Sequence, residues 1–323
     1  MQQEMQTQRI ADAAQIHAWL KLVALSLVLA LCLAFAWLQP GWPELLLGSV
    51  AICFVLAQFA FLGHDAGHGS IHQNAAWNGA LGHFCMTVVT GLAFTEWYNR
   101  HQAHHRHCQD EALDPDMDVS LLVSLTEQSR ESKSGLGRFL TRHQHLHVWF
   151  LSLFFAHSQR HLSQWGVLKE PIRFWKDLVP LALHVALWFG LPVFVLHVEF
   201  SRAAAVYVLP LFFLGPYLAA LFWLNHIGMP LVRSDASWSF LEHQSLTSRT
   251  VLNPKSMDWF FGGLNYQIEH HLYPKVPSFR LRRVQPIVQQ QFAREALAYN
   301  GVGFIDAVRH VAAHFRRIAK TTA

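Results

Sequence analysis

The sequence predicts an all-α integral membrane protein with four transmembrane helices, additional helices at the membrane interface and a cytoplasmic histidine-rich cap. Three observations support this fold class. Of the 323 residues, 52% are hydrophobic and 14% are charged, four apolar stretches are long enough to cross a bilayer, and 22 residues are histidine. A soluble domain has about 25% charged residues, so the composition argues against a soluble protein. We expect a single domain over residues 1–323, because the length alone gives no reason for a split in a membrane bundle.

The four predicted spans form two helical hairpins and cover about residues 22–38, 45–63, 178–198 and 203–224. Each stretch has the length needed to cross a hydrocarbon core of about 30 Å, at a rise of about 1.5 Å per residue. Gly41 and Pro43 lie in the connector of the first hairpin, where they end a helix and reverse the chain. The second hairpin turns around Ser201 and Arg202.

Two further apolar stretches, residues 77–94 and 147–168, contain ionisable side chains that disfavour a span. A histidine interrupts the first, and Arg160 with two histidines interrupts the second. We therefore expect these segments to form helices that lie in the membrane interface.

The distribution of basic residues predicts the orientation in the membrane. Of the 25 Lys and Arg residues, 24 lie before the first span, between the hairpins or after the last span, and Arg202 alone lies in a hairpin turn. Because cytoplasmic segments carry the excess of Lys and Arg, we expect both termini and the cap in the cytoplasm. The formal charge of +4 is not concentrated among aromatic residues, which favours a membrane surface as partner and argues against nucleic acid.

Three short segments at predicted cytoplasmic helix ends carry the candidate chemistry. Box 1 contains His64 and His68, box 2 contains His101, His104 and His105, and box 3 contains Gln267, His270 and His271. Positions i, i+3 and i+4 share one face of a helix, so each box can direct its side chains to one place. Seven imidazoles and one amide can surround two metal ions. Imidazole-rich sites with open positions suit iron, whereas four ligands satisfy a structural zinc.

The other histidines and the cysteines form no such clusters. An isolated histidine in or near a membrane helix is more often a hydrogen-bonded packing residue than a ligand, and we interpret six in this way: His17, His83, His184, His197, His310 and His314. The four cysteines include no C-x-x-C pair, so neither a disulfide framework nor an iron–sulfur site is predicted.

The order of the boxes, His-x-x-x-His, His-x-x-His-His and Gln-x-x-His-His, resembles the membrane fatty acid desaturase superfamily over residues 22 to about 290. The stretch GGLNYQIEHHLYP at residues 262–274 is similar to the front-end acyl desaturases, in which Gln opens the third box. The resemblance implies a cytoplasmic non-haem di-iron centre that uses O2 to abstract hydrogen from an acyl chain. The expected product is a carbon–carbon double bond in a fatty acid, an acyl thioester or a lipid-linked acyl group.

The resemblance also implies individual site residues. Asn225-His226 matches a histidine position after the last span, so His226 is expected to bind metal. Other members of the superfamily have His in place of Gln267, which is therefore expected to bind iron weakly or through water. Supporting contacts to the ligands are expected from five residues, Asp65, His72, His107, Asn225 and Glu269. Asp65 and Glu269 either accept the distal N–H of a ligand imidazole or are solvated. The acidic turn at residues 114–118 lies near the site mouth or is an exposed loop.

The electrons for such a reaction are expected from a partner. The sequence has no G-x-G-x-x-G segment after a strand, no P-loop and no cysteine cluster. Many front-end desaturases carry an N-terminal cytochrome domain marked His-Pro-Gly-Gly, a motif that does not occur here, which leaves the front-end regiochemistry open. The expected donor is a separate ferredoxin or a b-type cytochrome with its reductase, docked on the basic cytoplasmic face.

Three alternatives follow from the same residues. A di-iron centre could instead hydroxylate a fatty acid or another lipid, or decarboxylate a fatty acid to a terminal alkene. A membrane zinc hydrolase would use only three of the box histidines. A bis-histidine haem carrier would need ligands on facing helices, and the candidates His184 and His197 fall in one predicted helix.

Overall fold

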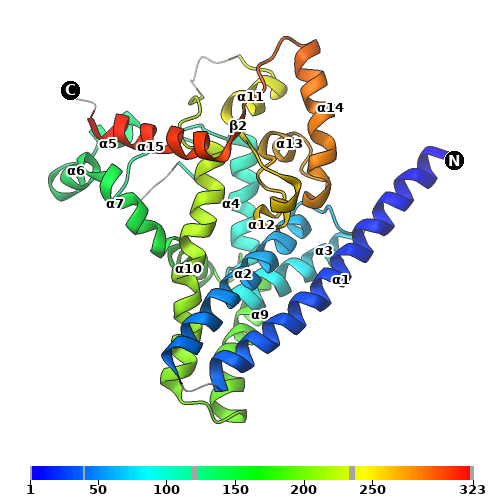
Figure 1. The fold of residues 1–323 in the computed structure, drawn as a ribbon, viewed down its shortest axis with the longest axis vertical. Helices are drawn as coiled ribbons and strands as arrows, with labels where there is room; N and C mark the ends of the chain where they lie inside the picture. The colour runs from blue at the N-terminus through cyan, green and yellow to red at the C-terminus, as the bar shows by residue number, and fades with distance from the viewer. Residues whose placement is uncertain (1, 39–40, 118–121, 233–236, 321–323) are drawn as a thin grey trace. The chain divides into compact units, whose positions relative to one another are not determined.

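The chain folds almost entirely into helices and turns, as Figure 1 shows, which confirms the predicted all-α class. The structure, a computed structural model, describes residues 2–38, 41–117, 122–232 and 237–320, with side chains from Ala14 onward. The chain divides into two compact units, each built from two separate stretches of sequence. Unit 1 comprises Met1–Tyr98 and Leu153–Leu218, and unit 2 comprises Asn99–Ser152 and Ala219–Ala323. A single domain over the whole chain stays a prediction.

Unit 1 contains the long apolar helices and two π-helices. Its elements are α1 (Gln2–Leu38), α2 (Trp42–Gly67), α3 (Ala75–Gly82), the π-helix η1 (His83–Thr90), the start of α4 (Phe94–His107), most of the 3-10 turn η2 (Ser152–Phe154), α8 (Phe155–Lys169), α9 (Trp175–Val185), the π-helix η3 (Ala186–Val195) and most of α10 (Phe200–His226). α1 packs along α2, and both α2 and α9 pack against η1.

Unit 2 contains shorter helices and, among the described residues, two short strands. Its elements are the rest of α4, η2 and α10, α5 (Glu127–Glu131), α6 (Gly135–Arg142), α7 (Gln144–Leu151), α11 (Phe240–Thr247), β1 (Thr250–Leu252), the 3-10 turn η4 (Lys255–Met257), α12 (Asp258–Phe261), α13 (Gln267–Leu272), the 3-10 turn η5 (Ser278–Arg280), α14 (Leu281–Arg294), β2 (Gly301–Gly303) and α15 (Phe304–Lys320). β1 and β2 are parallel, with Val251 opposite Val302.

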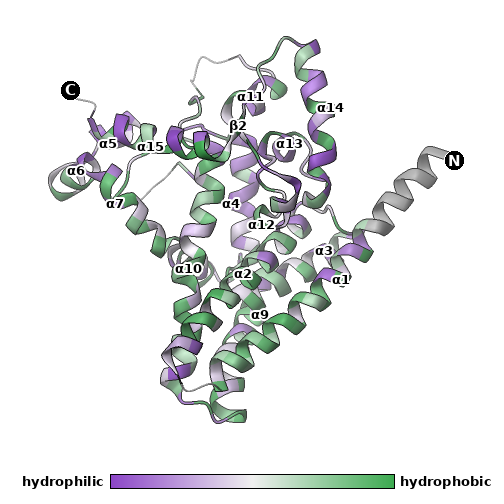
Figure 2. Ribbon diagram, in the orientation of Figure 1, coloured by the Kyte–Doolittle hydropathy of each residue, from purple (hydrophilic) through white to green (hydrophobic). Residues whose placement is uncertain are grey.

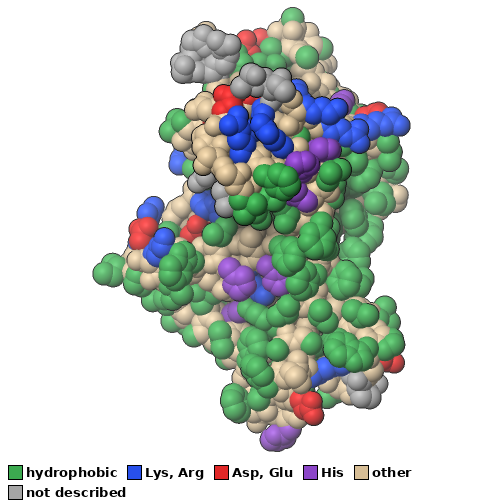
Figure 3. Space-filling view, turned by 90° about the vertical axis from the view of Figure 1, so that its left-hand side faces the viewer, with side chains coloured by type: hydrophobic (Ala, Val, Ile, Leu, Met, Phe, Trp, Pro, Cys, Tyr) green, Lys and Arg blue, Asp and Glu red, His purple; other side chains and the backbone are tan. Residues whose placement is uncertain are grey.

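Four helical stretches among the described residues are long and apolar enough to cross a membrane: Ala14–Leu38, Trp42–Gly67, Trp175–Val195 and Phe200–His226. They confirm the predicted number and order of spans, and their apolar residues are green in Figure 2. Large hydrophobic side chains on these helices are exposed. Figure 3 shows hydrophobic side chains over much of one face of the molecule. Such a surface is favourable in contact with the acyl chains of a lipid bilayer.

The third span differs from its predicted bounds. The helix ends at Val195 and not at residue 198, because His197 adopts a left-handed conformation with φ of 53°. The second half of the span, from Ala186, is a π-helix. The expected interfacial segments also differ from continuous helices: residues 77–94 form most of α3 and all of η1, and a 3-10 turn separates α7 from α8. Their placement in the interface stays a prediction.

Small residues allow the first hairpin to pack closely. A Cβ atom added at Gly48 of α2 would lie 2.8 Å from the Cβ of Ala36 on α1, so the two helices approach in the manner of small-residue contacts between membrane helices. Arg202 donates through Nε to the carbonyl of Ala36 at 2.7 Å and through Nη1 to that of Gly41 at 3.2 Å. The one basic residue of the hairpin turns therefore satisfies carbonyls near the end of α1.

The end of η1 explains the role of His184. In η1 the carbonyls of Val88 and Val89 receive side-chain hydrogen bonds from α9 and η3: His184 Nδ1 donates to Val88 at 2.9 Å, and Trp188 Nε1 donates to Val89 at 2.9 Å. Buried carbonyls need such partners where a helix ends. The interpretation of His184 as a hydrogen-bonded packing residue is therefore confirmed.

Unit 2 has a core that fixes the segment around box 3. Ile268 of α13 is fully buried and packs with Val288 and Phe292 of α14, which are each 1% exposed. Burial of one such side chain stabilises a fold by about 1.5–3 kcal/mol. A second apolar cluster brings Val311 and Phe315 of α15 together with residues near β1 and the end of α10. These contacts hold α13, which carries box 3, and the end of α10.

Candidate metal centre

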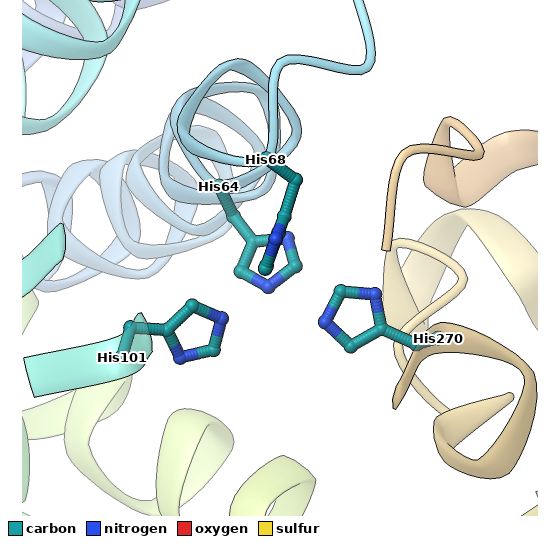
Figure 4. Close-up of side chains that lie close together, drawn as sticks. All are labelled: His64, His68, His101 and His270. Carbon is teal, nitrogen blue, oxygen red and sulfur yellow. The ribbon is translucent and has the colours of Figure 1, made fainter. Parts of the chain in front are cut away.

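Box 1 lies at the end of α2 in unit 1. His64 and His68 are one helical turn apart, their ring centroids are 4.7 Å apart, and Figure 4 shows both rings on the same side of the helix. The Nδ1 atom of His64 lies 3.7 Å from Oδ1 of Asp65. Gly69, with φ of 67°, then turns the chain away from the helix. The i, i+4 spacing thus places both imidazoles together, as predicted.

Box 3 is positioned by a glycine pair in unit 2. Gly262 and Gly263 have φ values of 60° and 79°, which favour glycine. A Cβ atom at Gly263 would lie 2.3 Å from the carbonyl oxygen of Ser278, so no other residue fits without movement of the backbone. The chain then enters α13, where Gln267, His270 and His271 are all buried. The glycines preceding box 3 therefore set the start of its helix.

The five box histidines of unit 2 and His226 form two groups of three imidazoles. Group A consists of His101, His105 and His270: the Nε2 atom of His105 lies 3.1 Å from Nε2 of His101 and 3.1 Å from Nε2 of His270. Figure 4 shows His101 on α4 and His270 on α13, with ring centroids 6.2 Å apart. Two nitrogens bound to one ion at about 2.1 Å each are separated by about 3 Å. The spacing within group A therefore suits ligands of one ion.

Group B consists of His104, His226 and His271. The ring centroid of His104 lies 4.8 Å from that of His226 and 5.2 Å from that of His271, and the last two are 5.1 Å apart. These residues and Cys108 each offer a potential ligand atom within 4.8 Å of the others, and all four are buried. The ring of His105 in group A stacks on His271 at 4.2 Å, so the two groups are adjacent.

Asp114 fixes the ring of His104. Its carboxylate oxygens lie 3.0 and 3.1 Å from Nδ1 of His104, and it also accepts from the backbone N–H groups of Gln109 and Asp116. Burial lowers the pKa of His104, but the hydrogen bond to Asp114 and the nearby carboxylate charges outweigh burial and raise it. Burial likewise raises the pKa of Asp114, but its bond to His104 outweighs burial and lowers it. The pair is a carboxylate–histidine arrangement of the kind that supports metal ligands.

The other two rings of group B are held in the same way. His271 Nδ1 donates to Oε1 of Gln244 at 2.7 Å, and His226 Nδ1 donates to the carbonyl of Thr247 at 3.2 Å. Gln244 is fixed in turn, because its Nε2 donates to the backbone carbonyl of His105 at 3.1 Å. Burial and the neighbouring imidazoles lower the pKa of His271, which keeps this ring neutral.

The acceptors at Nδ1 determine which nitrogen can bind a metal. In the neutral form of each group B ring, Nδ1 carries the proton that it donates and Nε2 keeps its lone pair. In that form all three Nε2 atoms can bind a metal ion, and binding at His104 would displace any second proton that its raised pKa favours. A metal site with imidazole ligands fits the group B rings, because they are buried, lie close to one another and have fixed tautomers.

Gln267 belongs to group B through its amide. Its Nε2 atom lies 2.9 Å from Nε2 of His226 and 3.1 Å from Nε2 of His271. Its Oε1 atom accepts from Nδ2 of Asn225 at 3.1 Å, and Asn225 also donates to the carbonyl of Leu264 at 2.9 Å. Asn225 thus supports Gln267, while the amide of Gln267 faces the nitrogens that would bind a metal.

Glu269 neither contacts an imidazole nor is solvated, which differs from both alternatives expected from the sequence. Its buried carboxylate accepts from Tyr299 Oη at 2.6 Å and from Thr250 Oγ1 at 2.7 Å. Burial raises the pKa of Glu269 despite these hydrogen bonds. Since Glu269 is two residues after Gln267, it points about 200° away around α13. It ties box 3 to β1 and to the segment before β2.

The two additional histidines expected near the boxes have other surroundings. His72 Nδ1 accepts from the backbone N–H of Asn74, and the ring lies near Trp77, so His72 supports the start of α3. His107 is the last residue of α4, and its carbonyl accepts from the N–H of Asp110. These contacts of His72 and His107 do not involve a box imidazole. Asp118 of the acidic turn lies outside the described residues.

Cys108 is a group B neighbour that the sequence analysis did not select. Its Sγ atom lies 3.4 Å from Nδ1 of His226, on the ring edge opposite Nε2, and donates to the carbonyl of Thr247 at 3.7 Å. Burial raises the pKa of the Cys108 thiol. A thiol that stays protonated is a poor metal ligand, so Cys108 packs behind His226. Gln244 was also missed, because no local pattern links it to box 3.

The apolar helices and the imidazole groups define an integral membrane protein with a candidate metal centre. The model of the fatty acid desaturase family matches residues 40–303, and the chain belongs to this family. This confirms the resemblance found in the boxes.

Several curated relatives are similar to most of this chain. A Delta(8)-fatty-acid desaturase of Borago officinalis is 29% identical over 282 residues, which is 82% of this chain and 62% of the relative. A Delta(8)-fatty-acid desaturase of Helianthus annuus is 27% identical over 296 residues, 87% of this chain and 64% of the relative. An acyl-lipid (9-3)-desaturase of Borago officinalis is 27% identical over 298 residues, 85% of this chain and 60% of the relative. The chain spans less than two thirds of the length of these relatives.

Proposed function

We propose that the chain is an oxidoreductase that introduces a carbon–carbon double bond into a fatty acyl chain with a non-haem di-iron centre and O2. The observation that carries the proposal is the pair of imidazole groups in unit 2, in which Nδ1 of every group B ring is hydrogen-bonded to an oxygen, so that Nε2 is the nitrogen with the lone pair in the neutral ring. Family membership supports the same reaction, because the relatives are named as desaturases.

The proposed ligands are the box imidazoles and His226. Group A supplies His101, His105 and His270, and group B supplies His104, His226 and His271. His64 and His68 are proposed as further ligands because of the spacing of box 1 in the sequence. A set this rich in imidazoles exceeds the four ligands of a structural zinc and suits iron with open positions. Bound iron would activate O2 and supply the oxidising power to break an unactivated C–H bond.

The chain's own residues would hold the neutral group B rings in one tautomer. Asp114, Gln244 and the carbonyl of Thr247 keep the proton of each group B ring on Nδ1. Gln267 is proposed as an adjacent amide whose orientation depends on Asn225. Fixed rings reduce the reorganisation needed when a metal binds, so these contacts favour a preorganised site.

The proposed reaction needs an external electron donor. Desaturation removes two hydrogen atoms from the acyl chain, and reduction of O2 to two molecules of water takes up two further electrons and two protons. A ferredoxin or a b-type cytochrome with its reductase would supply those electrons. The acyl substrate would be a free acid, a thioester or a lipid-linked chain, and the site would face the cytoplasm, where 24 of the 25 basic residues are predicted to lie.

Product analysis tests the proposal. Cells that express the chain with a ferredoxin or cytochrome reductase system receive saturated fatty acids, and their acyl groups are analysed by gas chromatography and mass spectrometry. We expect new unsaturated acyl groups of unchanged chain length, which a His104→Ala variant does not form. Hydroxy acids alone, or terminal alkenes one carbon shorter, would contradict desaturation and assign the same site to hydroxylation or decarboxylation.

A further inference from the structure

A buried arginine in unit 1 has no acidic partner. Arg160 of α8 is 3% exposed, and no carboxylate among the described residues pairs with its guanidinium, whose Nε makes no hydrogen bond there. Burial lowers the pKa of Arg160 to about 10, so the side chain is still charged at neutral pH. A buried cation without a counter-charge is strongly unfavourable. Among the described residues, no acidic side chain therefore balances the charge of Arg160.

The guanidinium is held by its face, which leaves its edge available. Its Cζ atom lies 4.0 Å from the centre of the Tyr207 ring on α10. The hydroxyl of Tyr207 is 3.0 Å from Nε2 of His184, which is itself fixed by the carbonyl of Val88. Stacking uses the face of a guanidinium, whereas carboxylates and phosphates bind the N–H groups at its edge. Tyr207 thus orients Arg160 without occupying the donors that recognise an oxyanion.

A glycine provides the space for this arrangement. Gly91 has φ of 78°, and a Cβ atom there would lie 2.6 Å from Nε2 of His184 and 2.8 Å from Cδ of Arg160. Any larger residue would displace one of these side chains. The position of the arginine therefore depends on contacts from three separate elements of unit 1.

His157 contributes a second polar atom without a partner. Its Nε2 atom is buried and makes no hydrogen bond among the described residues, and its ring packs 4.5 Å from that of Phe212. His157 precedes Arg160 by three positions on α8, so the two side chains share a helix face. Burial and the charge of Arg160 lower the pKa of His157 to about 4. The ring is neutral at pH 7 and can donate one N–H to an anion.

Exposed apolar side chains continue this face of α8. The ring centroid of His161 lies 6.4 Å from that of His157. Beyond it, Trp165 is 56% exposed and Leu168 is 66% exposed. A small inorganic anion would gain nothing from these side chains. A ligand with a negative headgroup and an apolar chain matches both the arginine and its apolar surroundings.

We propose that Arg160, together with His157, binds the oxyanion of a lipid at the surface of α8 and α10 in unit 1. The ligand is either a fatty acid, through its carboxylate, or a phospholipid, through its phosphate, and both offer the oxygens that the edge of a guanidinium recognises. None of the imidazoles of groups A and B takes part in this proposed contact, which does not depend on bound metal.

Native mass spectrometry of the full chain in detergent, prepared without metal or electron donor, tests the site. The probes are oleate, phosphatidylglycerol and the neutral methyl oleate. We expect Arg160→Gln to weaken binding of at least one anionic probe about tenfold, as the loss of a charge-assisted hydrogen bond predicts, and to leave methyl oleate unchanged. Selective loss of oleate identifies a carboxylate site, and selective loss of phosphatidylglycerol identifies a phosphate site.

Two further variants make the result specific. Arg173→Gln removes an exposed arginine of the same unit that already pairs with Glu170, and should not change binding. His157→Phe keeps the aromatic contact with Phe212 and removes the donor, so it should weaken the same anion to a smaller degree; it also replaces Arg160→Gln if that variant does not fold. Equal affinity of every variant for both anions would overturn the proposal. Since no turnover is measured, either outcome leaves the desaturase proposal to its own test.

Discussion

Asp114 accepts a hydrogen bond from Nδ1 of His104 at 3.0 Å, ten positions further along the chain. This contact holds the proton on the nitrogen that faces Asp114 and leaves the opposite nitrogen free toward His226 and His271. An acidic residue outside the boxes therefore determines how a box histidine can act.

Replacement of this acid should weaken the metal site. In Asp114→Asn the charge that supports His104 is lost while the shape of the side chain is kept, and we expect about tenfold to hundredfold weaker iron binding, the range for a lost partner of a metal-bound histidine. Iron retained during dialysis against a graded chelator measures this. Asp116→Asn is the matched control, because its more exposed carboxylate lies 3.5 Å from His104, and it should have the smaller effect. Equal effects of both variants would contradict the role of Asp114.

Gln244 should act on His271 in the same way. Gln244→Leu removes the oxygen that accepts from Nδ1 of His271 at 2.7 Å, so the ring can change tautomer or rotate. We expect iron retention to fall at least tenfold. Gln244→Glu keeps an acceptor for His271 but loses the donor to the carbonyl of His105, so it should retain more iron than Gln244→Leu and less than the unchanged chain. A fully active, iron-loaded Gln244→Leu protein would show that the ring is fixed by other contacts.

Gln267 should matter more for activity than for stability. Its amide contacts two group B nitrogens at 2.9 and 3.1 Å, whereas α13 is held by the burial of Ile268 against α14. Gln267→Ala is expected to lower desaturation at least tenfold and to change the thermal midpoint by only a few degrees, since about 1 kcal/mol shifts it by that amount. A large fall in the midpoint with normal specific activity would assign Gln267 to packing.

Reporter fusions test the orientation. We expect a reporter placed after Ser201 to be external and one placed after His226 to be cytoplasmic, because 24 of the 25 Lys and Arg residues lie on the predicted cytoplasmic side. The reverse pattern would contradict the proposed placement of both termini and of the boxes.

Local sequence was sufficient for the spans and for the boxes. Hydropathy over about 20 residues identifies a span, and the i, i+3 and i+4 spacing places box residues on one helix face. The end of the third span was less predictable, because the left-handed conformation of His197, with φ of 53°, ends the helix where residues 195–198 include no glycine or proline.

The support of the ligands could not be read from neighbouring residues. Gln244 and His271 are 27 positions apart and meet through tertiary packing, which no single-sequence pattern reveals. The expectation for Glu269 failed for a simpler reason. Adjacency to the ligands in sequence does not place a side chain beside them, because the rotation of about 100° per residue turns Glu269 toward Tyr299 and Thr250.

Metal analysis tests the central claim most directly, because the imidazole groups were interpreted as ligands of two ions. The full chain is loaded with ferrous iron under anaerobic conditions, freed of loosely bound metal, and measured for iron and zinc per chain together with desaturase activity. We predict about two irons per chain in active protein, with loss of both iron and activity in His104→Ala and in His270→Ala. One zinc per chain in active protein would contradict this account.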